Sequence, residues 1–238
     1  MALGIWRSPR GRPLEFEFRE GTNDWNTIQS CTVADEYGLA DFTVAGWALD
    51  IGAYLGSVTV ALLADNPDAH VLAVEPVPDN VRLIRRNLEL NGFSDRAIVV
   101  EAAAGPPGVS ESEIRWNYRG EEGLEHHAFV GNTSLAYERG GDLPHDAAMV
   151  PTFDYSALWR IAGHRLELVK IDAEGAEWGF LADPAIGGVP LILGEWHPVL
   201  GMTRADLLDR LGATHDVTFS GPESGPGGFR AVRRFTLP

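Results

Sequence analysis

The fold is decided by the stretch ALDIGAYLGSVTVALLADNPDAHVLAVEP, which covers residues 48–76. A short apolar run ends in Asp50 and a glycine turn, a helix-like segment follows, and a second apolar run ends in Glu75. This order is typical of a strand–turn–helix–strand unit. Ligands bind at the C-terminal ends of the strands in open parallel sheets, so we expect both carboxylates at a ligand-binding edge.

The same alternation of apolar runs and helical patterns continues along most of the chain. It predicts an α/β domain with a mainly parallel sheet. The last two apolar segments flank a Gly/Pro-rich turn, which predicts a closing antiparallel hairpin. The expected strands cover 47–51, 70–75, 96–102, 166–172, 189–195, 215–221 and 228–235. The expected helices cover 22–38, 56–64 and 80–91, with Asp79 as N-cap of the last, and a further helix begins after Thr203 and ends at Gly212.

A length of 238 residues fits one domain, which we place over 1–238. Within it, residues 1–45 are interpreted as an N-terminal helical segment. Residues 112–150 interrupt the alternation with a long, glycine-containing excursion, which predicts an insertion or a lid that selects the substrate.

The composition limits the partners. The chain has 19 Lys and Arg against 34 Asp and Glu, a net charge of −15. Nucleic-acid binding needs a cationic face, so we expect no nucleic-acid partner. Cys31 is the single cysteine, and no apolar stretch reaches membrane-spanning length. The start has no secretory signal, so we expect a cytoplasmic protein without a membrane partner.

The loop from Asp50 to Gly56 has DxGxxxG spacing, which differs from the GxGxxG of dinucleotide sites. A leading carboxylate repels a pyrophosphate but attracts the cationic groups of an amino acid next to a sulfonium. Gly52 allows a turn that other residues cannot adopt and lets a ligand approach. Glu75 at the next strand end can accept both hydroxyls of a ribose. Together these features favour S-adenosylmethionine as cofactor, although an acid at a strand end is often merely solvated.

Four segments resemble successive motifs of the FkbM family of methyltransferases: DIGAYLGSVTVALL, VEPVPDNVRLIRRNLELNG, VVEAAAG and LVKIDAEGAEW. The resemblance runs from about Trp47 to His197. It implies a class I methyltransferase, Rossmann-like fold and methylation of a hydroxyl on a small molecule such as a natural product or sugar. Tyr54 departs from the small polar residue usual in the family. By position, the resemblance implies cofactor contacts from Asp50, Gly52, Ala53, Tyr54, Gly56, Glu75, Glu101 and Asp172, with Glu101 near the adenine amino group.

Methylation of an alcohol requires alignment of the reactants and a proton acceptor. Asp172 ends an expected strand and Glu174 follows in a turn, so either could hold the acceptor or take its proton, or cap the next helix. His197 is a candidate general base that could pair with Glu195. Lys170 lies on the same side as Asp172 and is expected to anchor a nearby acid. The predicted catalytic residues are therefore Asp172, Glu174 and His197.

Alternatives remain open at this point. The acids and His197 match no compact metal motif, so we expect no metal. A nucleotide-dependent oxidoreductase or a non-catalytic scaffold could have the same sheet. The acceptor is not specified by the sequence, and the helix at 22–38 or the insertion could mediate a homo-oligomer.

Overall fold

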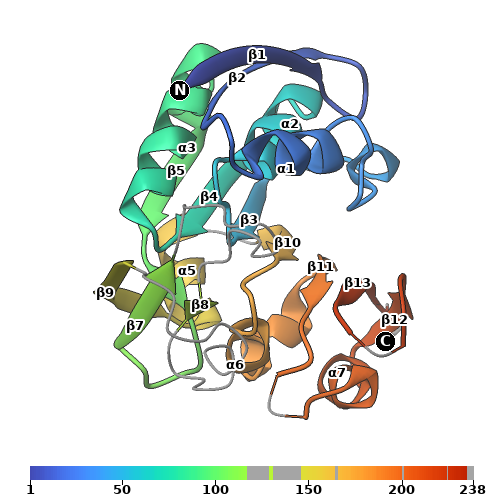
Figure 1. The fold of residues 1–238 in the computed structure, drawn as a ribbon. Coiled ribbons are helices and arrows are strands. Elements are labelled where there is room, and N and C mark those ends of the chain that lie inside the picture. Colours follow the sequence, from blue (N-terminus) through green and yellow to red (C-terminus); the bar gives the residue numbers. More distant parts are fainter. Residues whose placement is uncertain (117–128, 131–145, 164–165, 200, 224, 235–238) are drawn as a thin grey trace.

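The computed structural model describes residues 1–116, 129–130, 146–163, 166–199, 201–223 and 225–234. The central strands are β3 (Trp47–Ile51), β4 (His70–Glu75), β5 (Ala97–Glu101), β10 (Leu166–Ile171), β11 (Leu191–Trp196), β12 (His215–Phe219) and β13 (Gly227–Arg233). They form a seven-stranded sheet in the order β12-β13-β11-β10-β3-β4-β5 (Figure 1). Strands β11 to β5 run parallel, whereas β13 pairs antiparallel with β11 and β12. The predicted parallel sheet with a closing hairpin is confirmed.

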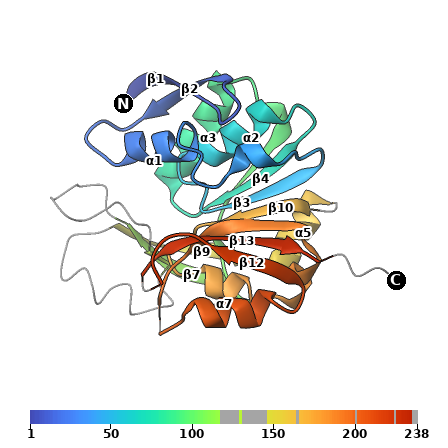
Figure 2. The same ribbon diagram turned by 90° about the vertical axis from the view of Figure 1, so that its right-hand side faces the viewer.

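Helices cover both faces of this sheet (Figure 2). One layer contains α1 (Asp24–Cys31), α2 (Ser57–Asp65) and α3 (Pro78–Leu90), and the other contains α5 (Tyr155–Ala162), α6 (Glu177–Phe180) and α7 (Arg204–Leu211). Along β4, Val71 and Ala73 pack into the first layer, and Leu72 and Val74 into the second. Apolar side chains on both sides explain the continuous apolar runs. In the described part of the chain, no helix has the length and apolar character to cross a membrane.

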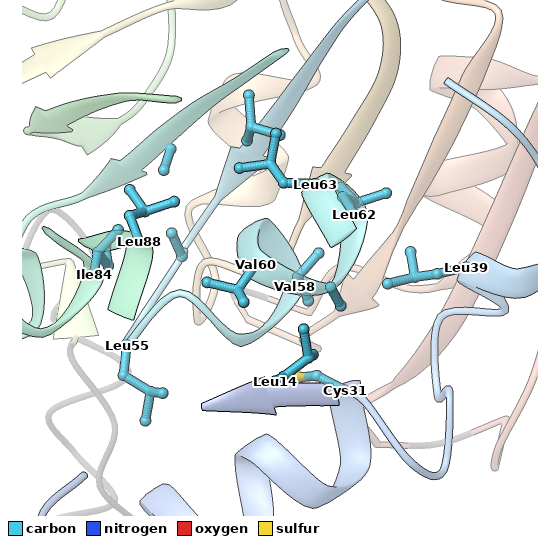
Figure 3. Packing of buried hydrophobic residues seen from close by; sticks show 14 of the residues in the cluster. Leu14, Cys31, Leu39, Leu55, Val58, Val60, Leu62, Leu63, Ile84 and Leu88 are labelled. Atoms are coloured by element: carbon cyan, nitrogen blue, oxygen red, sulfur yellow. The ribbon is translucent and has the colours of Figure 1, made fainter. Parts of the chain in front are cut away.

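The first layer has a continuous apolar core, shown in Figure 3. Every residue of α2 except Ala64 is buried, because this helix lies between the sheet and the N-terminal segment. Helix α3 instead buries one face, with Val81, Ile84 and Leu88. Its predicted N-cap, Asp79, is wrong. Val77 occupies that position because Pro78 fits the first helical residue, where no amide hydrogen is needed.

The N-terminal region differs from the predicted helical segment over 1–45. It begins with a β-hairpin of β1 (Ala2–Arg7) and β2 (Pro13–Phe18), and its helix is limited to α1. Strand β2 lies along α3, where the side-chain amides of Asn87 and Asn91 bond to the backbone of Glu17 and Glu15. The two asparagine side chains therefore make the hydrogen bonds to β2 that the backbone of a neighbouring strand would otherwise make. The hairpin is therefore stabilised by a helix that begins sixty residues after β2 ends.

The segment predicted as an insertion, 112–150, begins and ends within strands of a second sheet. This sheet has four strands in the order β6-β9-β7-β8, with β6 (Ala103–Ala104), β7 (Glu111–Trp116), β8 (Phe129–Val130) and β9 (Asp146–Phe153). Strands β7 and β9 pair antiparallel. The rest, 117–128 and 131–145, lies outside the described residues, so its role as a lid stays a prediction.

Candidate functional site

A cavity of about 270 Å³ opens at the C-terminal ends of the parallel strands, beneath helix α1. Of the predicted site residues, its lining includes Gly52, Ala53, Tyr54, Glu75, Asp172 and Glu174, and does not include Asp50, Gly56, Glu101 or His197. The helical wall comes from Asn23, Asn26, Thr27, Ser30 and Cys31, which the sequence reasoning did not select. The cavity therefore lies where the strand ends predict it, but one of its walls comes from α1 and the segments beside it.

Gly52 forms the floor of this cavity with a backbone that only glycine adopts easily, at φ +69°. A Cβ at this position would lie 1.8 Å from the carbonyl oxygen of Asp172. The backbone that approaches Gly52 is therefore that of the chain after β10, rather than only a ligand as the sequence suggests. Gly56, at φ +89°, is the N-cap of α2 and faces Ile84 of α3.

Tyr54 connects the glycine turn to helix α1. It is a non-glycine residue with positive φ, +52°, and its hydroxyl donates to Asp24 Oδ1 at 2.6 Å. The buried Asp24 also accepts two side-chain hydrogen bonds from Arg19 at 2.9 Å. Burial opposes the charge of Asp24, but these hydrogen bonds and the guanidinium keep its pKa below the usual value. This network holds the turn against the helix that covers the cavity.

Asp50 lies behind the cavity wall and is completely buried. Its Oδ2 accepts a hydrogen bond from Thr59 at 2.6 Å, and its Oδ1 lies 3.4 Å from Lys170 Nζ. Lys170 also donates to the carbonyls of Ile51 and Gly52, at 3.3 and 3.0 Å. Lys170 therefore stands between Asp50 and the cavity. A direct contact of Asp50 with the cofactor stays a prediction, and in this arrangement the charge of Asp50 is already compensated.

The buried Lys170 retains its proton. Burial opposes the ammonium charge, but Asp50 and Asp172 outweigh it and raise the pKa of Lys170 above its usual value. Its Nζ lies 5.4 Å from the centre of the Tyr37 ring. The expected anchoring role of Lys170 is thus found, and its ion-pair partner is Asp50.

The carboxylate of Glu75 lies at the end of β4 and is held in place by three hydrogen bonds. Its Oε2 accepts from the Tyr54 amide at 2.9 Å, and its Oε1 accepts from the Val77 amide at 3.1 Å and the Asn80 side chain at 2.9 Å. Burial raises its pKa to about 7 against these hydrogen bonds. A carboxylate has about four acceptor positions, so Glu75 retains capacity for a ligand hydroxyl.

Glu101 is opposite Glu75 in the pairing of β4 with β5, but it is exposed and does not line the cavity. The wall beyond β5 is formed by the small residues Ala102, Ala103 and Ala104. The run of small residues in VVEAAAG is the sequence feature that indicates this part of the cavity wall. A role of Glu101 in adenine binding stays a prediction.

Four titratable residues gather at the ends of β10 and β11. Asp172 Oδ2 accepts a hydrogen bond from the Tyr37 hydroxyl at 2.9 Å, while its buried Oδ1 has no hydrogen-bond partner among the described residues. His197 is held by Glu177 at Nδ1, 2.9 Å, and lies 3.4 Å from Glu174 at Nε2. Neither Asp172 nor Glu174 caps helix α6, whose N-cap is Ala176. The capping alternative is therefore wrong.

The partners of His197 set its protonation. Burial lowers the pKa of the imidazole, but Glu177, Glu174 and Asp172 raise it to about 10. A protonated imidazole cannot accept a proton, so the general-base role of His197 stays a prediction that this charge state opposes. The sequence reasoning missed Glu177, a fully buried acid within the KIDAEGAE segment. The sequence feature that indicates Glu177 is an acidic residue two positions after Gly175 in an otherwise apolar helix.

Glu195 has a different environment from these neighbours. In the described residues its carboxylate accepts no hydrogen bond and forms no ion pair, and burial with the nearby Asp172 raises its pKa to about 7. One donor atom each of Asp172, Glu195 and His197 lies within 4.8 Å of the others. The expectation that no metal is needed is not tested.

Comparisons with known proteins agree on a class. A family model described as the methyltransferase FkbM domain matches residues 50–209. The fold is similar to precorrin-6Y C5,15-methyltransferase from Geobacter metallireducens GS-15, at 14% identity and a TM-score of 0.50, covering 92% of this chain and 93% of that one. It is also similar to the provisionally assigned methyltransferase yhhF from Escherichia coli, at 13% identity and a TM-score of 0.51, covering 97% and 98%. These likenesses show the class I methyltransferase fold. No curated protein matches the chain.

Proposed function

The chain belongs to the FkbM methyltransferase family, and on this premise we propose that it methylates a hydroxyl oxygen of a small molecule such as a natural product or sugar. Family and fold make it an S-adenosylmethionine-dependent methyltransferase. The choice of oxygen and of a small acceptor is the proposal. The observation that carries it is a set of acids at the ends of β10 and β11, beside the cavity that suits the cofactor.

The residues of the cavity fit this cofactor. Glu75 has acceptor capacity for ribose hydroxyls at the end of β4, and the alanines after β5 leave room for a flat, apolar ring. Asp172 and Glu174, on the other side of Gly52, supply negative charge for a sulfonium and an ammonium group. The buried Oδ1 of Asp172 accepts no hydrogen bond from the described residues, so it is suited to a cationic or hydrogen-bonding ligand.

When bound, S-adenosylmethionine supplies an activated methyl group, so the protein has to align the acceptor and remove its proton. The turn at Gly52 and Tyr54 fixes the cofactor wall, and Tyr37 orients the carboxylate of Asp172. An acidic wall and a net charge of −15 both disfavour an anionic acceptor. This supports a neutral or cationic small molecule over a nucleic acid.

Two measurements test the proposal. Calorimetric titration is expected to give binding of S-adenosylhomocysteine and none of NADH, which also tests the oxidoreductase alternative. Incubation with methyl-labelled S-adenosylmethionine and a panel of small alcohols, amines and activated carbon acids then identifies the acceptor atom by mass spectrometry. Labelling of amines or carbon acids alone would contradict O-methylation. Absence of cofactor binding would instead favour the scaffold alternative.

A further inference from the structure

A second cavity, of about 290 Å³, lies next to the cofactor cavity. Its walls come from β11, from both strands of the closing hairpin and from the segment after α1. The two cavities share Glu36, Tyr37 and Glu195 in their linings. A molecule in the second cavity therefore adjoins the cofactor cavity at these three residues.

Glu195 differs from the other acids at this edge. Glu174 and Glu177 are engaged with His197, and Asp172 accepts from Tyr37 and lines only the cofactor cavity. Glu195 lines both cavities, and in the described part of the chain its carboxylate accepts no hydrogen bond, with a nitrogen of His197 within 4.8 Å of it. A half-buried carboxylate without a partner is costly unless a ligand or a proton meets it.

We infer that the acceptor alcohol binds in the second cavity and that Glu195 takes the proton of its reacting hydroxyl. This inference rests on the proposed O-methylation. The acceptor oxygen forms a bond to the methyl carbon, the carbon–sulfur bond breaks with its electron pair left on sulfur, and the hydroxyl proton moves to the Glu195 carboxylate. The products are a methyl ether, a neutral thioether and a protonated Glu195, so charge and atoms balance.

The lining indicates the class of acceptor. The carboxylates of Glu36 and Glu195 repel anions, and the single guanidinium, Arg230, lies 3.8 Å from Asp41. The apolar side chains on this face are Leu193 and Tyr37, because the rings of Phe219 and Phe229 pack into the second layer. A hydroxylated ring without negative charge fits these walls, such as a neutral glycoside.

The charges of the residues around Glu195 support its role as the proton acceptor. The groups that face Glu195 are Asp172, Glu174, Glu36 and the protonated His197. The three acids favour the neutral form of Glu195 after proton transfer, and His197 favours the ionised form that begins the reaction. His197 is thus a charge partner, and Glu195 is the carboxylate poised to change its protonation near neutral pH.

The binding site of the acceptor and the proton transfer are tested separately. The test of the binding site uses the full chain saturated with S-adenosylhomocysteine. Saturation-transfer NMR with methyl glucoside and methyl rhamnoside is expected to show binding, and with methyl glucuronide none. Thr218→Trp places a ring in the second cavity from an exposed strand position, and it is expected to abolish glycoside binding while cofactor affinity stays unchanged. Equal binding of the glucuronide, no binding of either neutral probe, or normal binding by Thr218→Trp would overturn the location.

Proton transfer is tested with Glu195→Gln and the matched surface variant Glu89→Gln. With carbon-13-labelled glutamate, the resonance that Glu195→Gln removes is expected to titrate near neutral pH. Methyl transfer to the alcohol that the wild type labels is expected to fall at least about 100-fold in Glu195→Gln, the usual contribution of a general base, with unchanged cofactor affinity. A fall of less than about threefold, as Glu89→Gln should show, would overturn the role.

Three further outcomes are distinct. If the wild type labels no alcohol, the proposed function fails and this inference fails with it. If the wild type loses transfer after treatment with EDTA and regains it with Mn²⁺, Glu195 acts as a metal ligand and the proton-acceptor role is overturned. Transfer to an alcohol that survives both EDTA and Glu195→Gln rejects the inference alone.

Discussion

The two halves of the strand-end surface are built differently. At the ends of β3 and β4, the acids have their partners: Asp50 is matched with Thr59 and Lys170, and Glu75 with backbone and side-chain amides. At the ends of β10 and β11, within the described part of the chain, one carboxylate oxygen of Asp172 and both of Glu195 accept no hydrogen bond. The first half is preorganised for one ligand, whereas the second retains charge for a reaction.

Lys170→Met is expected to have the largest effect, because it leaves the buried Asp50 without its counter-charge. Breaking a buried ion pair from one side typically costs about 3–5 kcal/mol of folding free energy. Chemical unfolding of the variant measures this loss. The double variant Lys170→Met with Asp50→Asn should recover a large part of it. No recovery would show that Lys170 acts through the carbonyls of Ile51 and Gly52 instead.

Gly52→Ala tests whether the two halves meet at the turn after β3. The added Cβ would overlap the Asp172 carbonyl, whereas Gly92→Ala has nearly the same φ, +70°, and open space around it. The left-handed backbone alone costs roughly 1–2 kcal/mol, which is the expected loss for Gly92→Ala. Overpacking adds about 1–3 kcal/mol for Gly52→Ala. Equal unfolding free energies of the two variants would contradict the close approach.

Glu75→Gln tests the preorganised half directly. It removes the charge that a ribose hydroxyl would meet, and hydrogen bonds to charged groups contribute about 1.5–3 kcal/mol. The dissociation constant of S-adenosylhomocysteine is therefore expected to rise roughly tenfold to a hundredfold in calorimetry. Glu101→Gln is the matched comparison, and its exposed position predicts a change of less than about threefold. A larger effect at Glu101 would restore it to the adenine site.

The pH dependence of stability tests the charged half. The pKa of His197 is raised to about 10 from an ordinary value of 6.5. Its stabilising contribution is therefore complete below the lower value and is lost as the pH rises through the higher one. The difference in Tm between wild type and His197→Gln should shrink from about pH 6 to about pH 10. A difference in Tm that stays constant between these two pH values would contradict the charge pairing of His197.

Local sequence patterns predicted most elements of the sheet. The period of β3 and β4, the caps of α7 and the turn before β13 are all readable within short windows. The hairpin of β1 and β2 was missed although PLEFEF alternates, because its supporting asparagines lie on α3. The helical wall of the cavity was missed for a similar reason. Nothing near Asn23 or Cys31 indicates that α1 faces the strand ends.

The sequence by itself determined where the carboxylates leave the sheet, because strand period and strand length place Asp50, Glu75 and Asp172 at C-terminal ends. Only the tertiary structure decided which of them keep a free charge. Lys170 pairs with Asp50, and Glu177 holds His197 and stabilises its protonated form, while Glu195 accepts no hydrogen bond from the described residues. The physical reason is that the partner of a buried charge is selected by distance and desolvation, and both depend on how remote segments pack together.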